Sequence, residues 1–263
     1  MLGKLLKYDL KWVYKLIIVF YCLAFIFSVI GRVFSTIEKS LVFEIVSQIA
    51  FGTAISMMVS SLINTLMRLW VRFNRNVYKD ESYLTHTLPV KKQEIFDSKV
   101  ITGFISIFTA MVVIIICLFI CYYSEANMEV LKSVLELAAS TYNTTVLNLL
   151  LLVAVVIFLE IVYGLLIGYV GIILGHKSNK NRMARSIVIG FILYFVLQAL
   201  TLGLIAFYGL FNPDVMNLLN TTDMVNIEAI KSVMYAGIGI YVVYIIILYF
   251  FGKKELNKGV NVE

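Results

Sequence analysis

Charged residues are scarce in this sequence. Only 14% of its 263 residues are charged, while 61% are hydrophobic and the mean hydropathy is +0.92. A soluble domain is typically about 25% charged and about 45–50% apolar. The charge deficit extends along the whole chain, so lipid as a solvent accounts for it better than one buried core does. The length gives room for a single membrane domain, residues 1–263, and none for a separate soluble domain.

The groups that carry most enzyme chemistry are also scarce. There are two histidines, His86 and His176, and neither an HExxH nor a GxSxG motif. A GxxxxGK[ST] phosphate loop is lacking too, so this chain does not cradle ATP in that way. The apolar stretches contain no acid pair, Ser–His dyad or metal cluster that would suit proteolysis within a membrane. We therefore expect a protein that is not an enzyme, with no catalytic residue, metal or cofactor of its own.

The cysteines and prolines argue against two further classes, metal or disulfide proteins and secondary transporters. Cys117 and Cys121 lie one helical turn apart, but no histidine or acid is near enough in sequence to complete a metal site, so packing is the better interpretation. Cys22 also falls in an apolar run, and no disulfide framework is implied. Both prolines, Pro89 and Pro213, lie outside the apolar stretches, whereas secondary transporters tend to have interrupted spans.

What the sequence does have is long apolar runs. A spanning helix needs about 20 mostly apolar residues. Strands are excluded because an open sheet edge cannot lie in lipid. We predict an all-α membrane protein with six transmembrane helices. The six stretches are 13–34, 42–67, 100–123, 144–174, 186–211 and 233–252.

The basic residues predict the orientation of these helices. Of the 22 lysines and arginines, 18 fall on one side of the predicted membrane, and Arg32, Lys39, Lys132 and Lys231 on the other. The positive-inside rule then places both termini and the loops 68–99 and 176–185 in the cytoplasm. This distribution also explains the basic pI without nucleic acid as a partner.

The first residues have an amphipathic pattern. Leu2, Leu5, Leu6 and Leu10 share one helical face, with lysines opposite. This pattern predicts an interfacial helix over 1–12 that lies on the inner membrane surface, its lysines near anionic lipid headgroups. A simple cytoplasmic stub is the alternative. On the outer side, 124–143 contains a predicted short helix and 212–232 is polar.

One acid, Glu160, is predicted deep in the bilayer, in the fourth span. Because a buried acid is costly, we expect it to face the bundle interior and to have a partner there. Glycines 164, 168, 171 and 175 continue its face in two GxxxG units, which allow close helix approach. Glu160 is either part of a substrate or gating site or a hydrogen-bonded packing residue.

Other polar side chains recur at helical spacing within the spans. They are Ser56, Ser60 and Asn64 in the second span and Gln198 in the fifth. Together with Glu160 they form a candidate translocation path. Interhelical hydrogen bonds, worth about 0.6 kcal/mol each, are the alternative explanation.

The loop 68–99 is the most informative segment. It is longer than the roughly 2–8 residues that connect packed helices. A solvated loop would not need so many apolar residues, so we expect them to be buried against this chain or a partner. They are Phe73, Tyr78, Tyr83, Leu84, Leu88, Ile95 and Phe96.

The stretch YKDESYLTHTLPVKKQEIFDSK, from Tyr78 to Lys99, and the opening MLGKLLKYDLK resemble ABC-2-type transporter permease subunits of low-GC Gram-positive bacteria. The resemblance implies one half of a multi-pass exporter in the bacterial plasma membrane. Two permeases, identical or paralogous, would pair with two ABC ATP-binding subunits that hold ATP and Mg²⁺. Similar systems export phenol-soluble-modulin-type toxins or antimicrobial peptides, so the cargo expected here is hydrophobic or amphipathic.

The resemblance also assigns roles to residues of the two cytoplasmic loops. The first loop would form the coupling helix that docks in the ATPase, and the second loop would make a smaller contact. The coupling residues are Tyr83, Leu84, Thr85, His86, Thr87, Leu88 and Pro89, with Lys177, Lys180 and Arg182 in the second contact.

Two other functions stay open on the sequence. One is a secondary transporter or channel that needs no partner, and the other is a membrane immunity protein that transports nothing. Dependence on a partner separates them from an exporter. A gene for an ATPase beside this one would favour the exporter.

Overall fold

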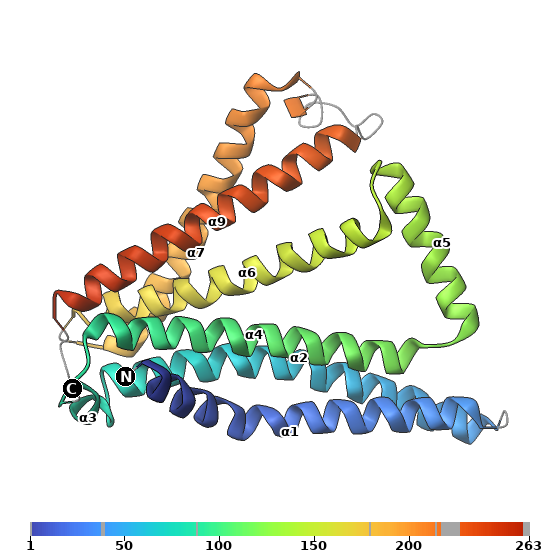
Figure 1. Ribbon diagram of the computed structural model, residues 1–263, viewed down its shortest axis with the longest axis horizontal. Coiled ribbons are helices and arrows are strands. Elements are labelled where there is room, and N and C mark those ends of the chain that lie inside the picture. The colour runs from blue at the N-terminus through green and yellow to red at the C-terminus, as the bar shows by residue number, and fades with distance from the viewer. Residues whose placement is uncertain are drawn as a thin grey trace. The chain divides into compact units, whose positions relative to one another are not determined.

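The computed structural model describes residues 2–37, 40–87, 89–178, 180–213, 215–216 and 227–259. In these residues the regular structure is helical, with eight helices and no strand, and six of the helices are long and apolar enough to cross a membrane. The chain is thus a multi-span helical membrane protein, and each of the six predicted stretches coincides with one long helix. The helices are α1 (Leu2–Thr36), α2 (Leu41–Val77), α3 (Ser82–Thr87), α4 (Lys92–Tyr122), α5 (Glu125–Thr141), α6 (Val146–Gly175), α7 (Arg182–Phe211) and α9 (Ile227–Asn257) (Figure 1).

The chain divides into two compact units, and the division falls within α5, after Leu131. Unit 1 contains α1 to α4, and unit 2 contains α6, α7 and α9. The prediction of a short helix in 124–143 is confirmed by α5. Each unit is described separately below.

In unit 1, α1, α2 and α4 pack along one another (Figure 1). Small side chains allow the three helices to approach: Ala24 of α1 and Ala54 of α2 meet Cys117 and Cys121 of α4 in one buried cluster. Both thiols are almost completely buried, as predicted for packing residues. Cys22, by contrast, is exposed.

Helix α1 is continuous from Leu2 to Thr36, with no break after residue 12. The predicted interfacial segment 1–12 is therefore the first part of the same helix as the first span. Its Leu5, Leu6 and Leu10 are half-buried and Asp9 is buried in unit 1. The location of this segment at the inner membrane surface stays a prediction.

In unit 2, α6 packs against α7 and α9. The contact with α7 depends on glycines. A Cβ atom on Gly175 would lie 2.5 Å from Ser186 Cα, and one on Gly171 would lie 3.0 Å from Gly190 Cα. The last part of the predicted glycine face is therefore occupied by a helix of the same chain.

Candidate functional site

A network of buried charges lies in unit 1 where α1 begins, α2 ends and α4 begins. Its centre is Asp9 of α1, which is only 3% exposed. The Asp9 carboxylate accepts hydrogen bonds from Lys99 Nζ (2.6 Å), Arg72 Nε (3.0 Å) and Ser98 Oγ (3.0 Å). We refer to Asp9, Arg72, Asn76, Glu81, Ser98 and Lys99 as the Asp9 network.

The Asp9 network extends to the residue before α3. Arg72 donates to Glu81 Oε2 at 2.6 Å, and Asn76 Nδ2 donates to the same oxygen at 2.7 Å. Lys99 Nζ also donates to Asn76 Oδ1 at 2.6 Å. Two cations and two anions thus balance, which is the condition under which buried charges are tolerated. Glu81, and with it the start of α3, is therefore bound directly to α2 and, through Arg72 and Asn76, to Asp9 of α1 and Lys99 of α4.

Trp12 of α1 packs against two arginines of α2 beside the Asp9 network. The guanidinium carbons of Arg68 and Arg72 lie 4.1 and 5.2 Å from the centre of its ring, within the range of cation–π interactions. Arg68 also donates to the Trp12 carbonyl oxygen at 2.7 Å. These contacts join α1 to α2 next to the charges.

Aromatic residues of the predicted loop 68–99 form a second layer. Phe73 of α2 meets the ring of Phe96 of α4 edge-on at 6.2 Å and the ring of Tyr78 at 6.5 Å. All three are buried, as is Ile95, and burial raises the pKa of the Tyr78 phenol. The expectation that this segment is buried against something is thus met within the chain for these four residues.

Helix α3 behaves differently. Tyr83 and Leu84 are 76% and 67% exposed, so no residue that the structure describes covers them. Thr85 faces the other way, is buried, and donates to the Glu81 carbonyl at 2.8 Å. Helix α3 therefore presents Tyr83 and Leu84 outward, while the residue before its start, Glu81, is bound in the Asp9 network.

The other residues predicted to couple to an ATPase follow at this end of unit 1. Thr87 is exposed and donates to the Leu84 carbonyl at 3.0 Å, and Pro89, also exposed, follows the helix. His86 is helical, but its side chain lies outside the described part of the structure, and so does Leu88.

The second predicted contact lies in unit 2, between α6 and α7. Lys177 forms an ion pair with Glu255 of α9, which is itself buried, and Lys258 Nζ lies 2.5 Å from the same carboxylate. Lys180 is exposed, and Arg182 is half-buried at the first position of α7. The structure thus gives Lys177 a structural partner and leaves Lys180 on the surface.

The candidate path residues of unit 1 form hydrogen bonds within their own helix. Ser56 is exposed and donates to the Gly52 carbonyl at 2.9 Å, while Asn64 donates to the Ser60 carbonyl at 2.8 Å. Ser60 and Asn64 are half-buried, as is Gln198 of unit 2. Their membership of a path stays a prediction.

Within unit 2 the Glu160 side chain is exposed and is not packed inward, so its expected place in the interior of the six-helix bundle, with a partner there, stays a prediction. The inward face of α6 is filled by Val162, Tyr163, Leu165 and Leu166, all of which are almost completely buried. Since α6 is apolar around its whole circumference, its hydropathy does not distinguish an inner face from an outer one.

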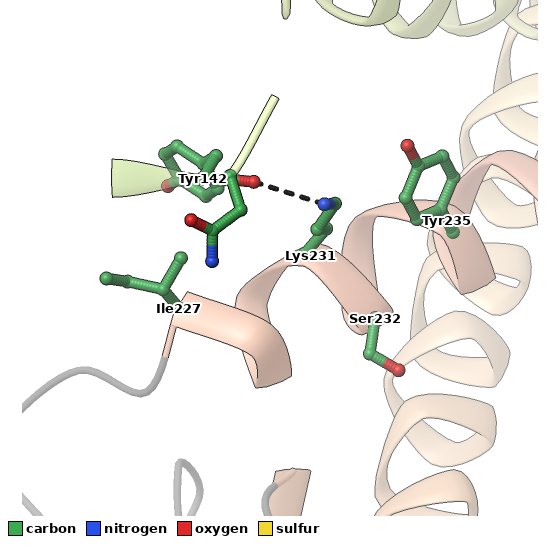
Figure 2. A pocket seen from close by; sticks show the side chains of 6 residues that line it. Tyr142, Ile227, Lys231, Ser232 and Tyr235 are labelled. Carbon is green, nitrogen blue, oxygen red and sulfur yellow. Dashed lines mark hydrogen bonds between the residues drawn. The ribbon is translucent and has the colours of Figure 1, made fainter. Parts of the chain in front are cut away.

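A pocket of about 290 Å³ lies at the other end of unit 2, away from Lys177 and Glu255. It is lined by Tyr142, Asn143, Ile227, Lys231, Ser232 and Tyr235 (Figure 2). The Lys231 ammonium donates to the Tyr142 carbonyl at 3.1 Å, which joins the end of α5 to the start of α9. The lining residues include no acid–base pair or activated nucleophile.

The Asp9 network is the part of the site that hydropathy and motif reasoning missed. A signal was present: Asp9 is the only acid among the lysines before the first apolar run, and Lys99 directly precedes the third. No family model, curated protein or solved structure matches this chain.

Proposed function

We propose that this chain is the transmembrane subunit of an ATP-driven exporter of the ABC-2 type in the bacterial plasma membrane. It moves a hydrophobic or amphipathic cargo outward by alternating access, driven by separate ATP-binding subunits. The observation that carries the proposal is the exposed Tyr83–Leu84 pair on α3, because large apolar side chains that lie together on an exposed surface mark interaction sites.

We assign this pair to a groove of the ATP-binding subunit, in which the two side chains dock. The resemblance of the stretch from Tyr78 to Lys99 supports this assignment, because that stretch includes α3 entirely. An apolar knob on a short helix suits docking in a groove. Thr87 and Pro89 border the same surface.

The Asp9 network supports the mechanical part of the proposal. A push on α3 reaches Glu81, then Arg72 and Asn76 of α2, and from there Asp9 of α1 and Lys99 of α4. The chain of hydrogen bonds from Glu81 to Asp9 and Lys99 is continuous, with each distance between 2.6 and 3.0 Å. Closure of two ATP-binding subunits would therefore move the three helices of unit 1 together rather than bend the loop.

The orientation and assembly follow the same proposal. Both termini are cytoplasmic, and two copies of the permease, or this chain and a paralogue, associate with two ATP-binding subunits. Lys180 and Arg182 form the second, smaller contact. No described feature favours a partner-free transporter or an immunity protein over this function.

The proposal predicts that an ABC ATP-binding subunit is encoded beside the gene for this chain. The test is ATP hydrolysis by that subunit in proteoliposomes. Hydrolysis is measured with the chain, without it, and with a chain that carries Tyr83→Ala and Leu84→Ala. We expect the double variant to lower hydrolysis to the level of the ATP-binding subunit alone, because it removes the knob and leaves the Asp9 network intact. A matched control is Val134→Ala with Leu137→Ala on α5, where the side chains are 57% and 69% exposed.

The control variant should hydrolyse ATP like the unaltered protein. Hydrolysis that is indifferent to the chain, or that persists in the Tyr83/Leu84 variant, would refute the exporter assignment. A partner-free transporter or an immunity protein would then be the better account.

A further inference from the structure

Glu160 lies near the middle of α6. It is 14 residues after the first residue of α6 and 15 before the last, so at 1.5 Å per residue it stands about 21 and about 22 Å from the two ends. The hydrocarbon core is about 30 Å thick. A helix that crosses it symmetrically therefore places this carboxyl group close to the midplane.

No cation of unit 2 is placed to pair with Glu160. In the sequence, α7 has no charged residue after Arg185, and α9 has none between Lys231 and Lys253. The Glu160 side chain is nevertheless exposed on the surface of the unit. An acid at this depth is costly without a partner, so the partner comes from outside unit 2.

The surroundings of Glu160 indicate what kind of partner fits. One turn further along α6, a Cβ atom on Gly164 would have no heavy atom within 4 Å among the described residues, so this face has open space. Three residues after Glu160, the ring of Tyr163 meets those of Tyr241 at 5.3 Å and Tyr194 at 6.2 Å. Tyr194 is 37% exposed, so part of this aromatic cluster reaches the surface.

A second observation comes from the Tyr163 hydroxyl group. It is buried and has no hydrogen-bond partner among the described residues. Residues three and four apart on a helix lie on the same side, so Glu160 and Gly164 lie toward the exposed side of α6, and the buried Tyr163 stands where this side meets the packed one. Together with the partly exposed ring of Tyr194, this edge combines a carboxyl group, an electron-rich ring and free space, which is the chemistry that recognises organic cations.

We propose that Glu160, Tyr163, Gly164 and Tyr194 form a binding site for a lipophilic organic cation, the cargo or the charged part of it. The cation supplies the positive charge that unit 2 lacks, and its apolar part stays in lipid. The inference rests on the proposed function in that it names the class of cargo. It adds that the hydrophobic or amphipathic cargo is positively charged.

The site is tested by equilibrium binding to the full chain in phosphatidylcholine nanodiscs, with no ATP-binding subunit present. The probes are radiolabelled tetraphenylphosphonium and its anionic counterpart of nearly the same shape, tetraphenylborate, each corrected for empty nanodiscs. We expect saturable binding of the cation and none of the anion. Glu160→Gln should lower the affinity for the cation at least about tenfold, because it removes the charge and keeps the shape.

Three further variants sharpen the test. Glu160→Asp keeps the charge and should retain binding. Glu136→Gln changes an exposed acid of α5 outside the apolar spans and should bind like the unaltered chain. Tyr194→Leu removes a ring at the surface of the cluster and should weaken binding about threefold or more. This last variant keeps the proposal testable if a substitution at Glu160 prevents insertion.

Either of two results would overturn the inference. One is the lack of saturable cation binding, or equal binding by the Glu160→Gln and unaltered chains. The other is a change in the number of chains per nanodisc in Glu160→Gln with cation binding unchanged, which would mean that Glu160 contacts another helix. Because no ATP-binding subunit is present, either result leaves the exporter proposal in place for another cargo. Failure of the ATP hydrolysis test, conversely, leaves the binding result standing.

Discussion

At the scale of single residues, the main feature of this protein is a charge cluster in a chain that has few charges. Asp9 and Lys99 have side chains that are 5% and 6% exposed, and their charged atoms are 2.6 Å apart. Taking such groups out of water is expensive, and the pair does not necessarily stabilise the fold relative to apolar residues. Its value lies in specificity, because it fixes where α1, α2 and α4 meet.

Loss of one member of the network should therefore be far more costly than loss of a surface pair. We expect Asp9→Ala to lower the free energy of unfolding by about 3–5 kcal/mol, since it leaves Lys99 buried without its anion. The measurement is unfolding of the purified chain by SDS in mixed micelles. Asp80→Ala, which removes a partner of Arg75 where both side chains are well exposed, should cost a small fraction of that.

A double substitution separates the charge from the contact. Asp9→Leu with Lys99→Met removes both charges and leaves Arg72 paired with Glu81, so most of the lost stability should return. If the double variant is as unstable as Asp9→Ala, packing rather than charge balance explains the effect.

The residue scale is also where sequence reasoning was weakest. The apolar side chains of the loop 68–99 predicted burial, and Phe73, Tyr78, Ile95 and Phe96 are buried. Hydropathy did not predict which of them remained exposed, because the separation of Tyr83 and Leu84 from the rest depends on where α2 ends and α4 begins; only the family resemblance had assigned these two residues to a partner. The side of α6 on which Glu160 lies was not predictable either, because a helix that is apolar all round has no marked face.

At the scale of elements, hydropathy located the helices but not their full lengths. The apolar stretch 42–67 became α2, which continues to Val77, and the stretch from residue 100 became α4, which starts at Lys92. The extra turns contain Arg72 and Lys99. These charged residues lower the mean hydropathy of any window that includes them, so the predicted spans stopped short of them. These residues remain helical because the Asp9 network satisfies their charges.

The glycines of α6 give a prediction with a built-in control. Gly175→Ala would place a Cβ atom 2.5 Å from the backbone of Ser186, so α6 and α7 would have to separate, and we expect clear destabilisation. Gly164→Ala has free space and should be neutral or slightly stabilising, because alanine favours a helix by up to about 1 kcal/mol. Unfolding by SDS measures both variants, and equal effects would contradict the contact at Ser186.

At the scale of the whole molecule, the two units carry different parts of the proposed mechanism. Unit 1 has the docking helix α3 and the Asp9 network, and unit 2 has Glu160 and the aromatic cluster around Tyr163. The exporter proposal needs one further condition that links them. The ends of unit 1 at α3 and of unit 2 at Lys177 must both face the cytoplasm, where ATP is available.

The distribution of basic residues predicts that orientation, and cysteine labelling tests it. In a chain in which Cys22, Cys117 and Cys121 are replaced by alanine, a single Tyr83→Cys or Leu137→Cys provides an exposed thiol, since the two side chains are 76% and 69% exposed. Expressed without an ATP-binding subunit, Leu137→Cys should react with a membrane-impermeant maleimide in intact cells. Tyr83→Cys should react only after permeabilisation, because 18 of the 22 lysines and arginines hold its side of the protein in the cytoplasm. The reverse pattern would place α3 outside the cell, where no ATPase can reach it.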